Sequence, residues 1–194
     1  MNRKALEIAA CEHLPWISYS PELHGSIETF FNLYPPSTTL TAQVPWISVH
    51  STRYKDKYRD LDGLSSAWLL SRTLGQTKMW DVDKLAKQFN VLSGSWLVNV
   101  AREKVDELWE SIVEFTLAGV LGVSAKVSYR EKYLDYKINI FNADYTSRIE
   151  VNGVRDGLRR LGITERLAYT PDIYIYCNIN SCNLWRIPPS RYTF

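Results

Sequence analysis

The sequence lacks the long apolar segment that a membrane-spanning helix requires. Nowhere do about 18 apolar residues follow one another, and the nearest approach, around residues 115–123, is interrupted by one threonine and two glycines. The first eleven residues begin like a secretory signal, but Glu7 interrupts an apolar stretch that is already short. We therefore expect neither export nor a membrane partner.

Cysteine is scarce, with three residues at positions 11, 177 and 182. A small, odd number of cysteines disfavours a secreted disulfide framework and favours a reducing compartment. We therefore expect an intracellular protein, in the cytoplasm, the nucleus or both. The spacing of these cysteines matches no standard zinc motif, so we expect no metal site and no cofactor.

A large excess of one charge is also missing. The chain has 23 Lys and Arg residues against 21 Asp and Glu residues, which leaves a formal net charge of +2. Dedicated nucleic-acid binders usually carry a strong basic excess. Any nucleic-acid site in this chain must therefore be local.

The sequence signatures of common enzymes do not occur either. There is no Walker loop, no dinucleotide-binding glycine fingerprint and no Gly-x-Ser-x-Gly elbow. His24 and His50 lie in polar, loop-like sequence, and no nucleophile, base and orienting group can be assembled around them. No catalytic residue is predicted, and an unrecognised enzyme remains only as a second alternative.

Residues 1–60 predict an arm that wraps a separate domain. They hold most of the prolines and show no sustained helical or strand period. Their aromatic content, which includes Trp16, Phe30 and Trp46, exceeds that of disordered sequence. We expect a mostly irregular arm over residues 1–60 and an α+β domain over residues 61–194, together forming a single globular unit.

The pattern in residues 61–194 predicts helices packed on a largely antiparallel sheet. A capping box at Ser147 to Glu150 marks the start of one helix, and Asp81 is expected to cap another. In the helix after Ser147, Arg155, Arg159 and Arg160 are expected on a solvated face, with Arg160 paired to Asp156. Helices are expected at residues 64–74, 82–90, 103–118 and 147–161, and strands at 95–100, 124–130, 136–141 and around Pro171 within 166–179. The proline predicts that this last segment is an edge strand, contains a bulge or breaks into two segments.

Three ordered motifs resemble a known family. They are residues 94–98 leading into 105–109, residues 119–128, and residues 161–163 followed by 167–174. Together they are similar to the basophilic-leukaemia-expressed protein family, over about residues 93 to 192. The fold of that family is similar to that of the mRNA cap-binding translation initiation factors. The resemblance implies a curved, mostly antiparallel sheet with helices packed on its convex face.

For function, the same resemblance implies much less than for fold. The cap-binding relatives clamp a methylated guanine between two tryptophans, one before the first helix and one after it. Here Val100 runs almost directly into the helix, and residues 117–123 after it contain no aromatic residue and no acid. Both clamp segments are missing, so we predict no specific binding of the methylated cap.

A pair of strands with basic residues is one feature of the cap-binding relatives that this sequence shares. The relatives hold phosphates with basic residues on the strands after the first helix, and this chain interleaves basic and aromatic residues there. Such interleaving suits a phosphate and a stacked base, whereas the alternative is an ordinary solvated surface paired with Glu131 and Asp135. The candidate nucleotide- or RNA-binding residues are Lys126, Tyr129, Arg130, Lys132 and Lys137.

Tryptophans in loop-like sequence are the other candidates for a site. Trp96 and Trp109 fall on apolar stripes and are expected in the core. Trp46, Trp80 and Trp185 are the residues able to rebuild a stacking clamp, although loop tryptophans more often cover a small satellite core. The leading hypothesis is a non-catalytic domain that binds RNA or a nucleotide, and the alternative is a protein-protein interaction module.

Overall fold

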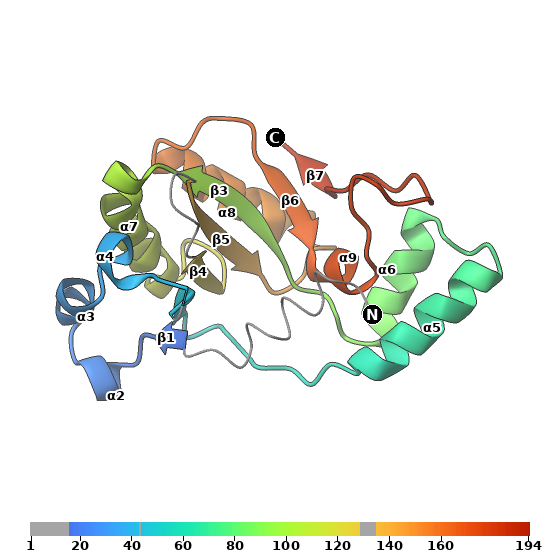
Figure 1. Cartoon of the computed structure of the whole chain (residues 1–194), viewed down its shortest axis with the longest axis horizontal. Coiled ribbons are helices and arrows are strands. Elements are labelled where there is room, and N and C mark those ends of the chain that lie inside the picture. The colour runs from blue at the N-terminus through green and yellow to red at the C-terminus, as the bar shows by residue number, and fades with distance from the viewer. Residues whose placement is uncertain (1–15, 43, 129–134) are drawn as a thin grey trace.

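The computed structural model describes residues 16–42, 44–128 and 135–194. A twisted sheet runs through the middle of the molecule, with helices behind it and at both ends (Figure 1). Within the described residues the sheet has seven strands in the order β1-β2-β4-β5-β3-β6-β7. The strands are β1 (Trp16–Ser18), β2 (Trp46–His50), β3 (Gly94–Val100), β4 (Ser124–Ser128), β5 (Tyr136–Asn142), β6 (Ala168–Pro171) and β7 (Tyr192–Thr193).

All neighbouring strands are antiparallel except β1 and β2, which run parallel. This confirms the predicted α+β class with a mostly antiparallel sheet. The helices are α2 (Pro21–His24), α3 (Ile27–Leu33), α4 (Pro36–Thr39), α5 (Leu61–Thr73), α6 (Met79–Gln88), α7 (Val105–Leu117), α8 (Arg148–Arg160) and α9 (Asp172–Tyr176), with a short 3₁₀ turn at Arg102–Lys104.

Helices α7 and α8 pack on one face of the sheet and enclose the main core (Figure 1). Trp109 of α7 and Trp96 of β3 are fully buried, as the apolar stripes predict. The indole of Trp96 donates a hydrogen bond to the carbonyl of Val151 in α8, with an N···O distance of 3.0 Å.

The arm is more regular than its sequence suggests. Strands β1 and β2 join the sheet beside β4, and α2, α3 and α4 lie between them. These elements are three to seven residues long, which is too short for a helical or strand period to stand out. The amide and hydroxyl of Ser37 donate to the Asp106 carboxylate at 2.8 and 2.5 Å, so the arm is anchored to the first turn of α7.

Two local predictions are wrong. The segment around Pro171 breaks at the proline, but the residues after it, expected in a strand, form α9, because proline cannot donate to a ladder and is well placed just before a helix. Helix α6 begins at Met79, not at Val82, and its N-cap residue is Lys78. Asp81 caps from inside the helix, where its carboxylate accepts the Lys78 amide at 3.0 Å.

One of the two hydrogen bonds predicted for the capping box of α8 is present. Ser147 accepts the amide of Glu150 through its hydroxyl oxygen, with an N···O distance of 3.4 Å. The amide of Ser147 donates to the carbonyl of Asp144, so the reciprocal bond from the glutamate side chain is replaced by a backbone turn. The start of α8 therefore matches the sequence prediction to within one residue.

Two glycines of α8 differ in the space around them, and we predict opposite effects on stability when each is replaced by alanine. A Cβ at Gly157 would lie 2.8 Å from Cδ1 of Leu121, whereas a Cβ at exposed Gly153 would meet no atom within 4 Å. We expect Gly153→Ala to stabilise the protein by about 1 kcal/mol, because alanine favours the helix. We expect Gly157→Ala to destabilise it by about 1 kcal/mol or more, because the tight contact forces Leu121 to move. Urea unfolding of both variants measures the difference, and equal shifts would contradict this packing.

Candidate functional site

The sheet carries a set of polar side chains on the face opposite α7 and α8, which we call the polar face. Side chains alternate between the two faces along a strand, so the positions between the buried core residues project to this side. Across the strands, Ser48 is the partner of Lys126, Lys126 that of Asn139, and Ser128 that of Lys137. The polar face consists of Ser48, Ser95, Asn99, Ser124, Lys126, Ser128, Lys137 and Asn139.

Three aromatic rings surround the predicted site residue Lys126. Its ammonium nitrogen lies 4.3 Å from the ring centroid of Trp46, 5.3 Å from that of Phe141 and 5.6 Å from that of Trp16. We call Trp16, Trp46 and Phe141 the three-ring cluster. A cation within about 6 Å of an aromatic face is attracted by the ring quadrupole. The candidate basic residue Lys126 and the candidate stacking residue Trp46 are thus in direct contact.

The other two rings of the cluster are not among the sequence candidates. Trp16 reaches Lys126 because β1 pairs with β2 and places Trp16 beside Trp46, with centroids 5.9 Å apart. Phe141 lies on β5 at a position that alternates with buried Ile140. Alternation along β5 was a signal that could have placed Phe141 on the same face as Lys137, whereas nothing in the sequence announces the pairing of β1 with β2.

The remaining candidates divide into two groups. Lys137 is half-buried on β5 and lies on the polar face, two residue pairs along from Lys126. Tyr129, Arg130 and Lys132 lie outside the described residues.

The structure does not bring Trp80 and Trp185 to the polar face. Trp80 is exposed near the start of α6. Trp185 packs edge-on against Trp68 of α5, with centroids 4.9 Å apart, and lies under the guanidinium of Arg72. Trp185 therefore covers a satellite core, which is the ordinary role of a loop tryptophan.

Two buried polar atoms near Lys126 have no hydrogen-bond partner in the described part of the chain. They are the hydroxyl oxygen of Ser48 and the indole nitrogen Nε1 of Trp46. Ser48 is the direct cross-strand neighbour of Lys126. Buried polar groups are normally satisfied, so we take these two atoms as candidate contacts for a ligand or an ordered water. Farther along the same face, Asn139 donates to the hydroxyl of Ser95 at 3.1 Å.

Asp172 supplies a carboxyl group to the same electrostatic environment. Burial raises the pKa of Asp172, while a hydrogen bond from Ser93 and the charges of Lys126 and Arg59 act in the opposite direction. The carboxyl of Asp172 is thus held by Ser93 and lies within the electrostatic influence of Lys126. Among the residues that the structure describes, no three His, Cys, Asp or Glu side chains gather as metal ligands.

The connections on either side of α7 are short, as predicted. Only Ala101 separates β3 from the 3₁₀ turn that leads into α7, and residues 118–123 join α7 to β4. Neither connection contains an aromatic residue. The aromatic surface near Lys126 comes from β1, β2 and β5 instead.

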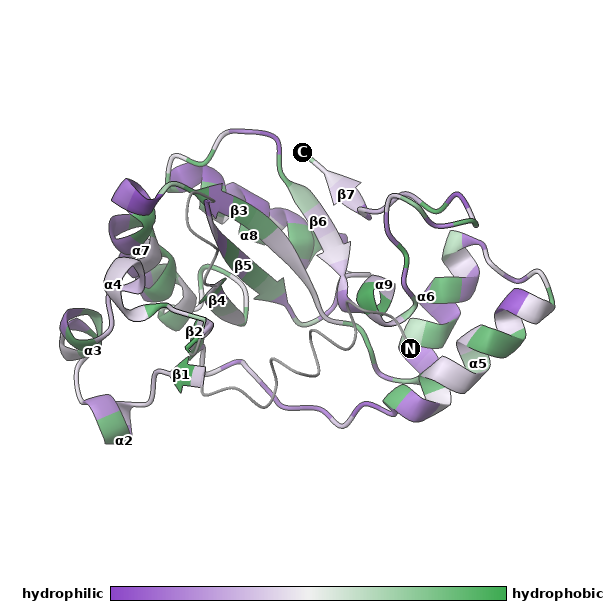
Figure 2. Ribbon diagram, viewed as in Figure 1, coloured by the Kyte–Doolittle hydropathy of each residue, from purple (hydrophilic) through white to green (hydrophobic). Residues whose placement is uncertain are grey.

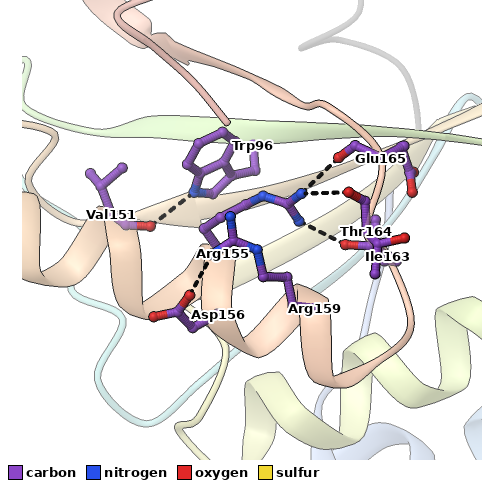
Figure 3. A network of polar contacts seen from close by, with 8 residues as sticks. All are labelled: Trp96, Val151, Arg155, Asp156, Arg159, Ile163, Thr164 and Glu165. Atoms are coloured by element: carbon purple, nitrogen blue, oxygen red, sulfur yellow. Dashed lines mark hydrogen bonds and ion pairs between the residues drawn. The ribbon is translucent and has the colours of Figure 1, made fainter.

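One basic candidate on α8 proves to be buried, which corrects the prediction of a solvated arginine face. Arg155 is 2% exposed, and its guanidinium donates to the carbonyls of Ile163 and Glu165 at 2.7 Å and to that of Thr164 at 3.4 Å (Figure 3). Burial and the neighbouring Arg159 lower the pKa of Arg155. These contacts tie the loop after α8 to the helix.

The predicted ion pair on the exposed side of α8 also differs. In the described part of the chain Asp156 pairs with Arg159, not with Arg160, at an N···O distance of 2.8 Å (Figure 3). Both side chains are about half exposed. Arg159 and Asp156 form a solvated pair, and Arg155 is a structural element of the core.

None of the described helices is both long and apolar enough to cross a bilayer. A sequence profile of the family described as basophilic leukemia-expressed protein Bles03 matches residues 65–178. The match covers most of the segment in which the family motifs occur.

Solved structures of cap-binding factors are also similar. Caenorhabditis elegans eIF4E-3, in a complex with the 4E-binding protein Mextli and cap analog, is 26% identical, with 43% of this chain and 52% of that chain covered and a TM-score of 0.38. Schistosome eIF4E complexed with m7GpppA and 4E-BP is 18% identical, with 53% and 58% covered and a TM-score of 0.41. Ascaris suum eIF4E-3 with m7G cap is 21% identical, with 54% and 58% covered and a TM-score of 0.41. The matches therefore span only slightly more than half of each relative.

Proposed function

The chain belongs to the basophilic leukemia-expressed protein Bles03 family, and we propose that it is a non-catalytic binding domain whose polar face takes RNA or a nucleotide. The observation that carries this proposal is the contact of Lys126 with the three-ring cluster, beside the buried hydroxyl of Ser48, which has no partner in the described part of the chain. A cation for phosphate and aromatic surface for a base are the two parts of a single-strand binding site.

Lys126 and Lys137 are the proposed phosphate contacts. They lie on neighbouring strands, with Ser128 the cross-strand partner of Lys137 and Asn139 that of Lys126, so both cations point to one side of the sheet. Tyr129, Arg130 and Lys132 lie outside the described residues, in the segment of sequence that follows Ser128, and we propose them as further contacts. Trp16, which is 41% exposed, is the ring of the cluster best placed for a base to stack on.

A salt-dependent titration of tryptophan fluorescence with a short uncapped RNA tests the proposal. Wild type is expected to bind, with affinity that falls as salt rises. The Lys126→Glu/Lys137→Glu variant is expected to bind at least about tenfold more weakly and to reduce the salt slope by about 1.4, since each phosphate contact to a single strand contributes about 0.7.

Lys84→Glu/Lys87→Glu is the matched control, because it makes the same change of charge on exposed positions of α6. If both double variants weaken binding equally, bulk charge alone accounts for the affinity and the polar face is not the site. If wild type does not bind at low salt, the proposed function is wrong.

The exposed apolar residues at the α5–α6 end favour a second candidate function, a protein-protein interaction module. Leu69 and Leu70 of α5, Leu74 directly after it and Trp80 of α6 are 57–61% exposed, and apolar turns are visible along α5 in Figure 2. Exposed apolar surface of this kind is often an interaction site. Partner capture that survives Lys126→Glu/Lys137→Glu and is lost in Leu70→Glu/Trp80→Glu would support this function over RNA binding.

A further inference from the structure

We propose that the ammonium of Lys126 is the cation that occupies the three-ring cluster. Its charge makes the site bind ligands that combine an uncharged ring with an anionic group, and reject ligands whose ring is positively charged. This inference rests on the proposed function for the identity of the ligand, an RNA or nucleotide. The claim about Lys126 itself rests on the geometry of the cluster and can be tested without a nucleotide.

The three rings form an aromatic site for a cation, and the ammonium of Lys126 from the same chain occupies it. Trp16, Trp46 and Phe141 come from three different strands, and the ammonium of Lys126 lies within 6 Å of all three centroids. The planes of Trp16 and Trp46 are inclined by 34° with centroids 5.9 Å apart, so this pair does not form a parallel slot for a flat ring. The ammonium therefore occupies the electron-rich surface on which a cationic ring depends.

A second positive charge at these rings would lie within a few ångströms of the ammonium. Like charges at such a separation repel, and they do so more strongly at a half-buried position than in bulk water. A neutral base avoids this repulsion and still has the exposed surface of Trp16 available for stacking.

The groups around Lys126 suit an anion. The hydroxyl of Ser48 and the indole N–H of Trp46, which have no partner among the residues that the structure describes, are both able to donate, and they lie on the strand that pairs with that of Lys126. An ammonium, a hydroxyl and an indole N–H form a donor set that matches phosphate oxygens.

The first test compares GTP with N7-methyl-GTP, which differ by one methyl group and one positive charge on the base. Wild type is expected to bind the methylated nucleotide no more tightly than GTP, by tryptophan fluorescence. Lys126→Met keeps an unbranched side chain that is one atom shorter and removes its charge, and we expect it to shift the affinity ratio by about tenfold towards the methylated nucleotide. Lys126→Arg keeps the cation and should retain the wild-type ratio.

The second test uses tetramethylammonium chloride, with sodium chloride at equal concentration as the control. The indole ¹H–¹⁵N signals of Trp16 and Trp46 should shift saturably in Lys126→Met and not in wild type or in Lys137→Met. This second test separates the inference about Lys126 from the proposed function, because it requires no nucleotide binding. A wild type that prefers N7-methyl-GTP by tenfold, or a Lys126→Met variant whose indole signals ignore tetramethylammonium, would overturn the inference.

Discussion

Replacing Arg155 with leucine should lower the free energy of unfolding by about 3 kcal/mol. Arg155 is buried and donates to three successive backbone carbonyls, those of residues 163, 164 and 165 (Figure 3). A hydrogen bond to a charged group contributes about 1.5 to 3 kcal/mol, and a buried acceptor left unpaired costs about 1 to 3 kcal/mol. Leucine fills part of the space but satisfies none of the carbonyls.

Thermal unfolding followed by circular dichroism measures this effect. For a protein of this size, 1 kcal/mol corresponds to about 2 to 4 °C in Tm, so a drop of about 6 to 12 °C is expected. Arg159→Leu, one turn along the same helix, breaks only the exposed pair with Asp156 and should cost less than about 1 kcal/mol. Equal destabilisation by the two substitutions would contradict the structural role of Arg155.

Asp83→Ala is expected to be the second strongly destabilising change, at about 2 to 4 kcal/mol. The Asp83 carboxylate of α6 accepts the hydroxyl of Tyr145 at 2.7 Å and the guanidinium of Arg191 at 2.8 Å. Tyr145 is fully buried, and burial together with the hydrogen bond to Asp83 raises its pKa. Alanine would leave the hydroxyl of Tyr145 without its acceptor and the charge of Arg191 without its partner.

A double-mutant cycle separates this cause from a simple loss of packing. Tyr145→Phe removes the hydroxyl that Asp83→Ala would leave unpaired, so the double variant should be more stable than the sum of the two single changes predicts, by about 1 kcal/mol. Urea unfolding of the four proteins provides the cycle. Additive effects would show that the hydroxyl and the carboxylate are not coupled.

The sequence predicts the half of the fold that is built from long elements. Helices α7 and α8 and the strands between them have clear periods, and Ser147 marks the start of α8. The strands of the arm are three and five residues long. A segment of that length has no readable period, and its place beside β4 depends on contacts between residues far apart in the chain.

The candidate site is predictable to the same limited extent. Lys126 and Lys137 follow from the alternation of two strands. Trp46 is expected in a loop, whereas it begins strand β2. Trp16 could not be assigned because its role depends on the parallel pairing of β1 with β2. The sequence predicts Arg155 on a solvated face, although the side chain is buried. The periodic pattern of a helix shows which positions face inward, but it does not show that the carbonyls of the next loop accept hydrogen bonds from this side chain.

The most direct test of the polar face as a ligand site is a two-dimensional ¹H–¹⁵N spectrum of the tryptophan indoles, recorded with and without a short uncapped RNA. The account predicts that the signals of Trp16 and Trp46 move as RNA is added, whereas those of buried Trp96 and Trp109 and of distant Trp80 and Trp185 stay in place. Signals that move only at Trp80 and Trp185, or no movement at any indole under conditions of low salt, would contradict it.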